Sequence, residues 1–327
     1  MNATPEIPKT LQQAIRYFSD EQVCINIVSI LRWPDAIPTC PRCANKDHYW
    51  LDTQKRWKCK KCSRQFSVKQ GTIFEDSPLP LDKWLAALWL IVNCKNGISS
   101  HEVAKDLGVT QKSAWFMLHR LRLALQSRTL DSKLGSGGGE IEVDEAFIGP
   151  KPQKMHRDRR LKMRGLQKGQ TKAIVMGMLD RESREVRAKV IPDVKRETLQ
   201  STILNEVKTG STVYTDGYPG YDNLAARQYI HETVNHLNEY VRGEVHTQGI
   251  ENFWSLLKRG LTGTYIAVEP FHMDRYVGEQ VFRYNNRATK DNPLTDADRF
   301  ALAVSQISGK RLTYAELTGK VGGGTDF

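Results

Sequence analysis

The chain has 327 residues and a formal charge of +11 at neutral pH, because 48 Lys and Arg outnumber 37 Asp and Glu. Hydrophobic residues make up 39% of it and charged residues 26%, which is typical of a globular protein with two or three domains. No apolar run reaches the ~18 residues of a membrane-spanning helix. The start of the chain lacks a charged segment followed by an apolar one, so we expect a cytosolic protein.

The positive charge is concentrated in two segments. Residues 55–69 contain seven Lys and Arg and no acidic residue, and residues 151–172 contain nine against the single acid Asp158. A basic run is often only a solvated face. Two such runs beside recognisable modules favour contacts with nucleic-acid phosphates.

The first seventy residues divide into a helical segment and a small cysteine-containing module. Residues 10–32 predict one or two short helices, and Pro34 and Pro38 then end the helical pattern. We therefore assign residues 1–35 to an N-terminal helical segment and residues 36–70 to a zinc ribbon.

Four cysteines form two matched pairs separated by fifteen residues, namely Cys40 with Cys43 and Cys59 with Cys62. Each pair can direct two thiolates to one ion from a tight turn, and four sulfurs in a tetrahedron suit Zn²⁺. Such a site has no open position, so we predict one structural zinc ion that supports folding of the module. A redox-active Cys-x-x-Cys needs one reactive pair, which fits two matched pairs poorly.

Short strands are predicted around the cysteines, at residues 49–51, 56–58 and 64–68. Their aromatic residues allow two interpretations, because they either form the core of the module or contact DNA. The two remaining cysteines, Cys24 and Cys94, lie in apolar helical stretches and are predicted to be small buried hydrophobes. A disulfide framework is not expected in a cytosolic protein.

The pattern becomes helical after residue 78. Two helices are predicted at residues 81–93 and 99–107, Gly108 makes a turn, and Thr110 caps a third helix that ends near Gln126.

This order is typical of a helix-turn-helix, which we assign to residues 78–130. Such patterns also arise by chance, but the neighbouring zinc ribbon favours the assignment. Lys112 on the third helix is a candidate DNA contact.

A glycine-rich linker at residues 135–139 precedes the third region. Three strands, a helix, two strands and a further helix follow, and this order is that of an RNase H-like α/β fold. We assign residues 136–290 to this domain and residues 291–327 to a C-terminal helical tail, with a helix around residues 298–306. The predicted strands are residues 140–148, 172–180, 186–191, 212–215 and 229–233, and the predicted helices are residues 198–207 and 250–259.

Three acidic residues of this domain are candidate metal ligands. Asp144 lies within a predicted strand, Asp216 ends another, and Glu251 opens a helix. Phosphoryl transfer by two hard cations ~3.5–4 Å apart needs carboxylates that converge from different elements. Lys258 follows Glu251 by nearly two helical turns and shares its face. Spacing alone does not distinguish this arrangement from a solvated stripe of Glu and Lys.

Residues 36–320 resemble the zinc-ribbon DDE transposases of bacterial insertion sequences, specifically the ISXO-like group. The block at residues 246–260 is the most specific part of the match. The stretches that carry the resemblance are residues 40–62, 142–149, 215–218, 246–260, 263–265 and 283–287.

The resemblance implies that Asp144, Asp216 and Glu251 bind two catalytic Mg²⁺ or Mn²⁺ ions and that Lys258 is the downstream basic residue. Asn252 remains an alternative third ligand, although a carboxylate holds Mg²⁺ better than an amide. Glu142 shares the strand face of Asp144 and Glu145 points to the opposite face. His246 either contacts phosphate or caps the helix.

The resemblance implies a bacterial DNA transposase, which is expected in the cytoplasm in association with the nucleoid. The zinc ribbon and helix-turn-helix would bind the terminal inverted repeats, and an RNase H-like, retroviral-integrase-type domain would cleave a strand and join its 3′-OH to target DNA. Lys258, Arg259 and residues 151–172 would hold the DNA backbone, in a homo-oligomer. Two alternatives are a non-cutting DNA-binding regulator derived from a transposase and a nuclease that acts on RNA or a hybrid.

Overall fold

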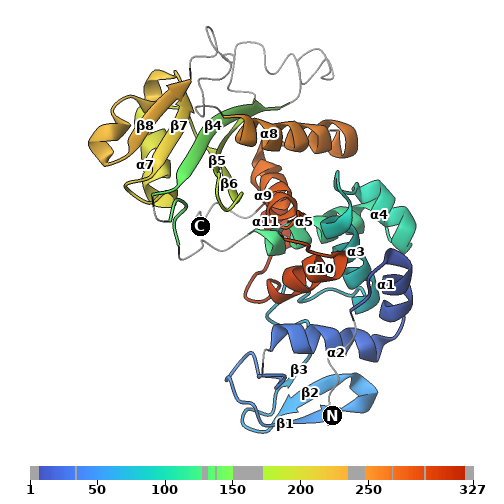
Figure 1. The fold of residues 1–327 in the computed structure, drawn as a ribbon. Helices are drawn as coiled ribbons and strands as arrows, with labels where there is room; N and C mark the ends of the chain where they lie inside the picture. Colours follow the sequence, from blue (N-terminus) through green and yellow to red (C-terminus); the bar gives the residue numbers. More distant parts are fainter. Residues whose placement is uncertain are drawn as a thin grey trace. The chain divides into compact units, whose positions relative to one another are not determined.

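The structure, a computed structural model, describes residues 7–33, 35–126, 132–136, 138–149, 172–234, 247–266, 268–290 and 292–320. The chain forms two compact units, one from Met1–Gln126 together with Asn286–Phe327 and the other from Ser127–Asn285 (Figure 1). None of the described helices has the length and apolarity needed to cross a membrane.

The first unit combines a small antiparallel sheet with helices from both ends of the chain. Strand β2 pairs with both β1 and β3, which confirms the three predicted strands. The segment predicted as one or two helices forms two, because the Asp20 side chain accepts the N–H groups of Gln22 and Val23 and so starts a second helix. The elements are α1 (Leu11–Phe18), α2 (Glu21–Arg32), β1 (His48–Leu51), β2 (Arg56–Cys59), β3 (Gln65–Phe66), α3 (Leu81–Asn93), α4 (Ser100–Leu107), α5 (Gln111–Leu125), α10 (Asp296–Ser305) and α11 (Tyr314–Leu317).

The two cysteines outside the matched pairs differ in burial. Cys24 is fully buried in α2 and its Sγ donates to the Phe18 carbonyl at 3.2 Å, which confirms the prediction of a small buried residue. Burial raises the pKa of its thiol to about 12. Cys94 is only half-buried, so the prediction is wrong there. It is the residue that follows the last turn of α3, where the chain leaves the helix.

Helices α4 and α5 are joined by a short turn at residues 108–110. Ser99 and Glu102 form a capping box at the start of α4, and Gly108 ends the helix with a φ of +60°, a left-handed conformation that favours glycine. The Thr110 side chain then accepts the N–H of Ser113 at the start of α5. These three local signals explain why the boundaries of both helices are predictable.

The C-terminal segment packs within the first unit. Phe300 of α10 is fully buried, and its ring centroid lies 5.3 Å from that of Phe18 and 5.5 Å from that of Trp89. Helix α11 lies against α5 through Tyr314 and Phe116, whose ring centroids are 5.7 Å apart. The predicted helix around residues 298–306 is therefore confirmed as α10 and belongs to the core of this unit.

The second unit contains a five-stranded sheet in the order β6-β5-β4-β7-β8. Strands β4, β5 and β6 form an antiparallel meander, whereas β7 pairs with β4 and β8 pairs with β7 in parallel. This topology defines the RNase H-like fold and confirms the predicted order of elements. The elements are β4 (Glu140–Ile148), β5 (Ala173–Asp180), β6 (Val186–Ile191), α7 (Arg196–Glu206), β7 (Thr212–Asp216), β8 (Ile230–Val234), α8 (Gln248–Gly260) and α9 (Met273–Asn285).

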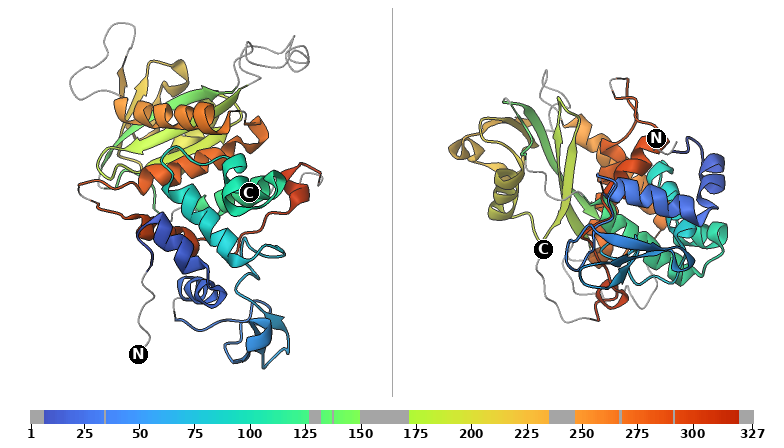
Figure 2. Two further views of the ribbon diagram at one scale, coloured as in Figure 1. Left: turned by 90° about the vertical axis from the view of Figure 1, so that its right-hand side faces the viewer. Right: turned by 90° about the horizontal axis from the view of Figure 1, so that it is seen from below.

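Helices cover both faces of this sheet, which gives three layers (Figures 1 and 2). On one face α8 and α9 bury Phe253, Trp254 and Val277 against β4, β5 and β6. On the other face α7 and the turn after β7 bury Leu199 and Tyr221. Because side chains alternate along a strand, β4 contributes to both layers.

Helix α9 is tied to the edge strand β6 by one side chain. Asn285 accepts the Val186 N–H at 2.8 Å and donates to the Val186 carbonyl at 2.9 Å. The Asn285 amide thus takes the place of one residue of a further strand.

Replacement of Asn285 by Ala is expected to lower the free energy of unfolding by about 2 kcal/mol, because it leaves the N–H and C=O of fully buried Val186 without these partners. Chemical denaturation followed by circular dichroism measures this change. Asn205→Ala, at an exposed position of α7, is the matched control and should change stability by less than about 0.5 kcal/mol. Equal effects of the two variants would contradict the prediction.

Candidate active site

The register of two neighbouring strands brings Asp144 and Asp216 together. In the parallel ladder Glu142 of β4 lies beside Tyr214 of β7. If this register is extended by two residues, Asp144 comes opposite Asp216, the last residue of β7, and the charge of Asp216 does act on Asp144. The two parallel strands thereby supply two carboxylates on one face of the sheet, one from the middle of β4 and one from the end of β7.

Helix α8 brings Glu251 to the same face. Trp254 lies on the helix side that packs on the sheet, and its Nε1 donates to Asp144 Oδ2 at 2.9 Å. Glu251 precedes Trp254 by three residues and therefore lies on nearly the same side of α8. Its Oε1 accepts the Thr247 hydroxyl at 3.3 Å, and the residue is exposed.

The choice between Glu251 and Asn252 as a site residue follows from helix geometry. Both residues are exposed in the first turn of α8. Successive residues turn by ~100°, so Asn252 points about 160° away from Trp254 whereas Glu251 points about 60° away. The negative charge of Glu251 also raises the pKa of Asp144. Both arguments favour Glu251.

Burial and neighbouring charges raise the pKa of two acids of β4, Asp144 and Glu145. Burial raises the pKa of Asp144, and the charges of Asp216 and Glu251 raise it further against the Trp254 hydrogen bond, which lowers it. Burial raises the pKa of Glu145 to about 8, helped by the charges of Asp144 and Asp216. A cation beside Asp144 would offset the effect of the neighbouring negative charges on this carboxylate.

The donor chemistry of the three acids fits Mg²⁺ or Mn²⁺, which prefer carboxylate oxygens and retain open positions. Their oxygens are not gathered as tightly as the thiols of the first unit. The ligand atoms of the four cysteines all lie within 4.8 Å of one another. Among the described residues, the three acids do not form such a set. Joint binding of one cation therefore requires the carboxylates to rotate towards one another.

The two other acids of β4 point to opposite faces, as the alternation predicts. Glu142 faces α8 and accepts the Ile250 N–H at 2.9 Å. Glu145 faces the other layer, where the Tyr221 hydroxyl donates to it.

The basic residues expected to contact DNA are exposed where they are described. Lys258 and Arg259 lie in the last turn of α8. Lys112 is exposed in the first turn of α5, and its Nζ lies 4.8 Å from the centroid of the Tyr314 ring. His246 and the basic segment at residues 151–171 lie outside the described residues.

Gly177 of β5 is a site residue that the sequence interpretation missed. It pairs with Asp144 across the sheet. A Cβ atom at this position would lie 2.7 Å from the ring of Trp254 and 2.9 Å from Ile250 Cδ1. The absence of a side chain makes room for the indole that holds Asp144. A glycine inside a strand is a known sign of such a close approach.

Replacement of Gly177 by Ala is expected to displace the Trp254 indole and to lower the free energy of unfolding by about 1–3 kcal/mol, because the core there has no space for a methyl group. Urea denaturation measures the loss. Gly263→Ala is the control, since its added Cβ would meet no atom within 4 Å. A Gly177→Ala protein as stable as this control would show that the indole has room to move.

The four paired cysteines converge in the first unit. The Sγ atoms of Cys40 and Cys62 are 3.7 Å apart, and those of Cys43 and Cys59 are 3.6 Å apart. Each pair precedes a residue in the left-handed conformation, Ala44 and Ser63, whose N–H groups bond back to the first cysteine of the pair. Two equivalent turns thus present four thiols to one point.

The thiol chemistry also fits a bound metal ion. The backbone N–H of Cys62 is the main cause that lowers the pKa of Cys59 to about 6, so one thiolate is stabilised before any metal binds. The Asn45 N–H acts to lower the pKa of Cys43, but burial and hydrogen bonds from the other cysteines raise it to about 12. The donor set is the all-sulfur tetrahedron that Zn²⁺ favours.

The aromatic residues of this module separate into a core and a surface. Trp57 is buried, and its ring lies 5.7 Å from both Phe66 and Trp33. Tyr49 is 57% exposed, and Lys60 Nζ lies 4.9 Å from its ring centroid. Core packing therefore accounts for Trp57, whereas Tyr49 remains available for contact.

Fold and site together define a protein with a four-cysteine ribbon followed in the sequence by an RNase H-like domain. Residues 137–285 match the ISXO2-like transposase domain, and residues 19–65 match the transposase zinc-ribbon domain. The chain belongs to the ISXO2-like transposase family.

Individual relatives agree with this membership. An uncharacterized protein in transposable element ISH50 of Halobacterium salinarum is 26% identical over 262 residues, which cover 76% of this chain and 85% of that protein. An uncharacterized transposase-like protein of Haemophilus influenzae is 34% identical over 101 residues, 31% of this chain and 81% of that protein. The catalytic core domain of BIV integrase is similar with a TM-score of 0.32 and 13% identity, covering 49% of this chain and 91% of that chain. The strand order, and not this last likeness, defines the fold.

Proposed function

We propose that this transposase cleaves a DNA strand at the end of its element and joins the freed 3′-OH to target DNA, with Asp144, Asp216 and Glu251 as ligands of catalytic Mg²⁺ or Mn²⁺. The observation that carries the proposal is the approach of three carboxylates from β4, β7 and α8 on one sheet face. Two of them, Asp216 and Glu251, are close enough to raise the pKa of the third, Asp144. Carboxylates from separate elements are what a phosphoryl-transfer site needs.

Bound divalent cations would supply Lewis-acid activation of the attacking oxygen and charge stabilisation at the phosphate. The chain's own residues prepare this site. Trp254 fixes the orientation of the Asp144 carboxylate, and β7 fixes Asp216 at the end of the strand. Lys258 and Arg259, two turns beyond Glu251, offer cations for the DNA backbone.

The zinc ribbon and the helices α3–α5 are proposed to bind the terminal repeats. The ribbon exposes four cations with no ion pair within the described part of the chain, namely Arg56, Lys58, Lys61 and Arg64. Lys58 lies directly across the sheet from exposed Tyr49. A basic sheet surface with one exposed ring suits phosphate contacts. Helix α5 is proposed as the recognition helix, with Lys112 at its start as a DNA contact.

Substitution of both Lys58 and Arg64 by Gln is expected to weaken DNA binding and to make it less sensitive to salt. The slope of log K against log salt should fall in magnitude by about 0.9 for each DNA phosphate that the variant no longer neutralises. Binding titrations at several salt concentrations measure this slope. Lys46→Gln is the control, because Lys46 belongs to the same ribbon but is already paired with Asp35. An unchanged slope in the double variant would remove this face from the DNA interface.

The proposed reaction is tested with purified protein, Mg²⁺ or Mn²⁺, and DNA that carries the element's own terminal repeat. Joined products are expected, and they should vanish in an Asp216→Asn variant that still binds the repeat. Tight repeat binding without cleavage by the unchanged protein would instead identify a DNA-binding regulator. Cleavage of RNA or a hybrid without repeat binding would identify a nuclease.

A further inference from the structure

Glu142 is a buried carboxylate at the centre of the proposed site that the proposed reaction does not use. Its side chain has no solvent exposure, although it lies only two residues from Asp144 on the same face of β4. Its Oε2 accepts the Ile250 N–H at 2.9 Å, and its Oε1 accepts from Arg181 Nε at 2.9 Å. A buried charge persists only with such partners.

The Ile250 N–H belongs to the first turn of α8, where helix N–H groups have no partner within the helix. Glu142 supplies both a hydrogen-bond acceptor and a negative charge at this positive helix end. Gly249 makes the approach possible, because a Cβ there would lie 2.8 Å and 3.2 Å from the two oxygens of Glu142 and 3.1 Å from Leu179. The helix start is thus fitted against the carboxylate.

Two bonds attach α8 to β4. Glu142 binds Ile250, and Asp144 binds Trp254. Two residues along a strand span about 6.7 Å, and four residues along a helix span about 6 Å. These lengths match, so the paired bonds set the position of the helix along the strand, and Glu251 lies between the two attachment points.

We infer that Glu142 is a positioning residue of this active site, which anchors the first turn of α8 and so places Glu251 opposite Asp144. The inference rests on the proposed metal-binding role of Asp144 and Glu251. Residues that orient metal ligands typically change metal affinity or activity by about 10–100-fold when they are replaced.

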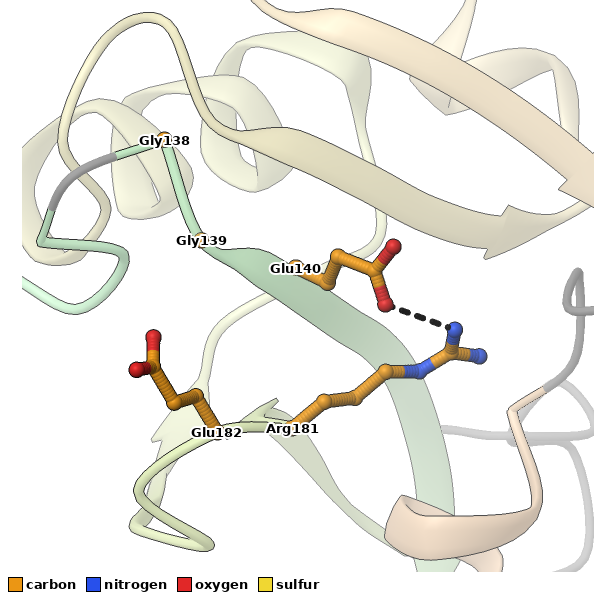
Figure 3. A pocket seen from close by; sticks show the side chains of 5 residues that line it. All are labelled: Gly138, Gly139, Glu140, Arg181 and Glu182. Carbon is orange, nitrogen blue, oxygen red and sulfur yellow. Dashed lines mark hydrogen bonds and ion pairs between the residues drawn. The ribbon is translucent and has the colours of Figure 1, made fainter.

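Arg181 orients the Glu142 side chain through their ion pair. Its side chain is 13% exposed, and its guanidinium lies 4.0 Å from the Tyr214 ring centroid and 3.2 Å from Glu140 Oε2. Arg181, Glu140 and Glu182 line a cleft of about 440 Å³. Figure 3 shows the ion pair between Arg181 and Glu140, with Glu182 directed away from it. The Arg181 guanidinium forms ion pairs with both Glu140 and Glu142. The cleft therefore lies on the side of Arg181 that binds Glu140.

Three variants test the anchor. Glu142→Gln keeps the side-chain volume but removes the charge that pairs with Arg181, and Gly249→Ala displaces the helix start without changing any charge. Glu140→Gln is the matched control, since Glu140 pairs with the same Arg181 but makes no hydrogen bond to the described residues of α8. Hydrogen exchange of the amides in the first turn of α8 and Mn²⁺ binding followed by electron paramagnetic resonance are measured on each full-length protein without DNA.

Amide exchange in the first turn of α8 is expected to accelerate about tenfold or more in Glu142→Gln and Gly249→Ala. The Mn²⁺ concentration at half saturation should rise about 10–100-fold, and Glu140→Gln should change neither. Unchanged exchange and unchanged Mn²⁺ binding in both test variants would overturn the inference. Mn²⁺ binding that Asp144→Asn leaves intact would overturn the proposed metal site instead, whereas the exchange measurement judges the anchor separately.

Discussion

Replacement of Asp144 by Asn is expected to lower the rates of strand cleavage and strand transfer by about 10³-fold or more, while the variant still binds the terminal repeat. A metal ligand whose loss removes several kcal/mol of charge stabilisation costs a factor of this size. Single-turnover assays with the terminal-repeat DNA measure both rates. Asp222→Asn, an exposed acid of the same unit, should retain activity close to that of the unchanged protein.

The same substitution should increase stability when no metal is present. Burial and the charges of Asp216 and Glu251 raise the pKa of Asp144, so its ionised form opposes folding at any pH above that pKa. Asn carries no charge, and its amide oxygen can still accept from Trp254. The variant should therefore melt at or above the temperature of the unchanged protein in a metal-free buffer.

Mn²⁺ should reverse this order. A cation at 100 times its dissociation constant stabilises a folded protein by about 2.7 kcal/mol, and the Asn variant lacks the ligand for it. Thermal unfolding with and without Mn²⁺ distinguishes a metal site from a merely structural acid. An Asn variant that is less stable without metal and equally stabilised by Mn²⁺ would mean that Asp144 is structural.

The main elements of both units follow from local sequence signals. Alternating hydrophobic residues indicate β4, and Ser99, Gly108 and Thr110 mark the ends of α4 and α5. Helix α9 is not predicted from the sequence, because its buried side contains Glu279, Gln280 and Arg283. Arg283 donates to Glu279 and to Gln280, and these polar residues interrupt the apolar positions Met273, Tyr276, Val277 and Tyr284 on the buried side of the helix.

The candidate site is only partly visible in the sequence. The resemblance to known transposases points to Asp144, Asp216 and Glu251, because these acids lie within the stretches that match the family's motifs. The partners of Glu142 are distant in the chain, 108 residues away for Ile250 and 39 for Arg181, and no local pattern reveals such pairs. An acid inside a strand is more often a solvated residue, and only the packing of α8 makes it a buried anchor.

Removal of zinc, by chelation or by Cys59→Ser, is expected to unfold the ribbon and abolish binding to the terminal repeat, while the second unit remains folded. The ribbon sheet has strands of only two to four residues, and its few buried side chains include Trp57, Phe66 and Val68. A core of this size does not fold alone. Structural Zn²⁺ binds with an apparent free energy of about 10–16 kcal/mol in zinc-finger peptides, which is the energy that such a module lacks.

Metal analysis and DNA binding of Cys59→Ser and Cys94→Ser test this prediction. Cys94 is a half-buried cysteine outside the four-thiol set, so its variant should keep one zinc ion per chain and bind the repeat normally. Arg32 of α2 donates to the Val68 and Gln70 carbonyls at 2.8 Å and 2.6 Å. These two bonds join α2 to the end of the ribbon, so loss of zinc should also expose α2 to proteolysis. A zinc-free chain that keeps α2 protected and still binds the repeat would show that the helices alone hold the ribbon in its folded state.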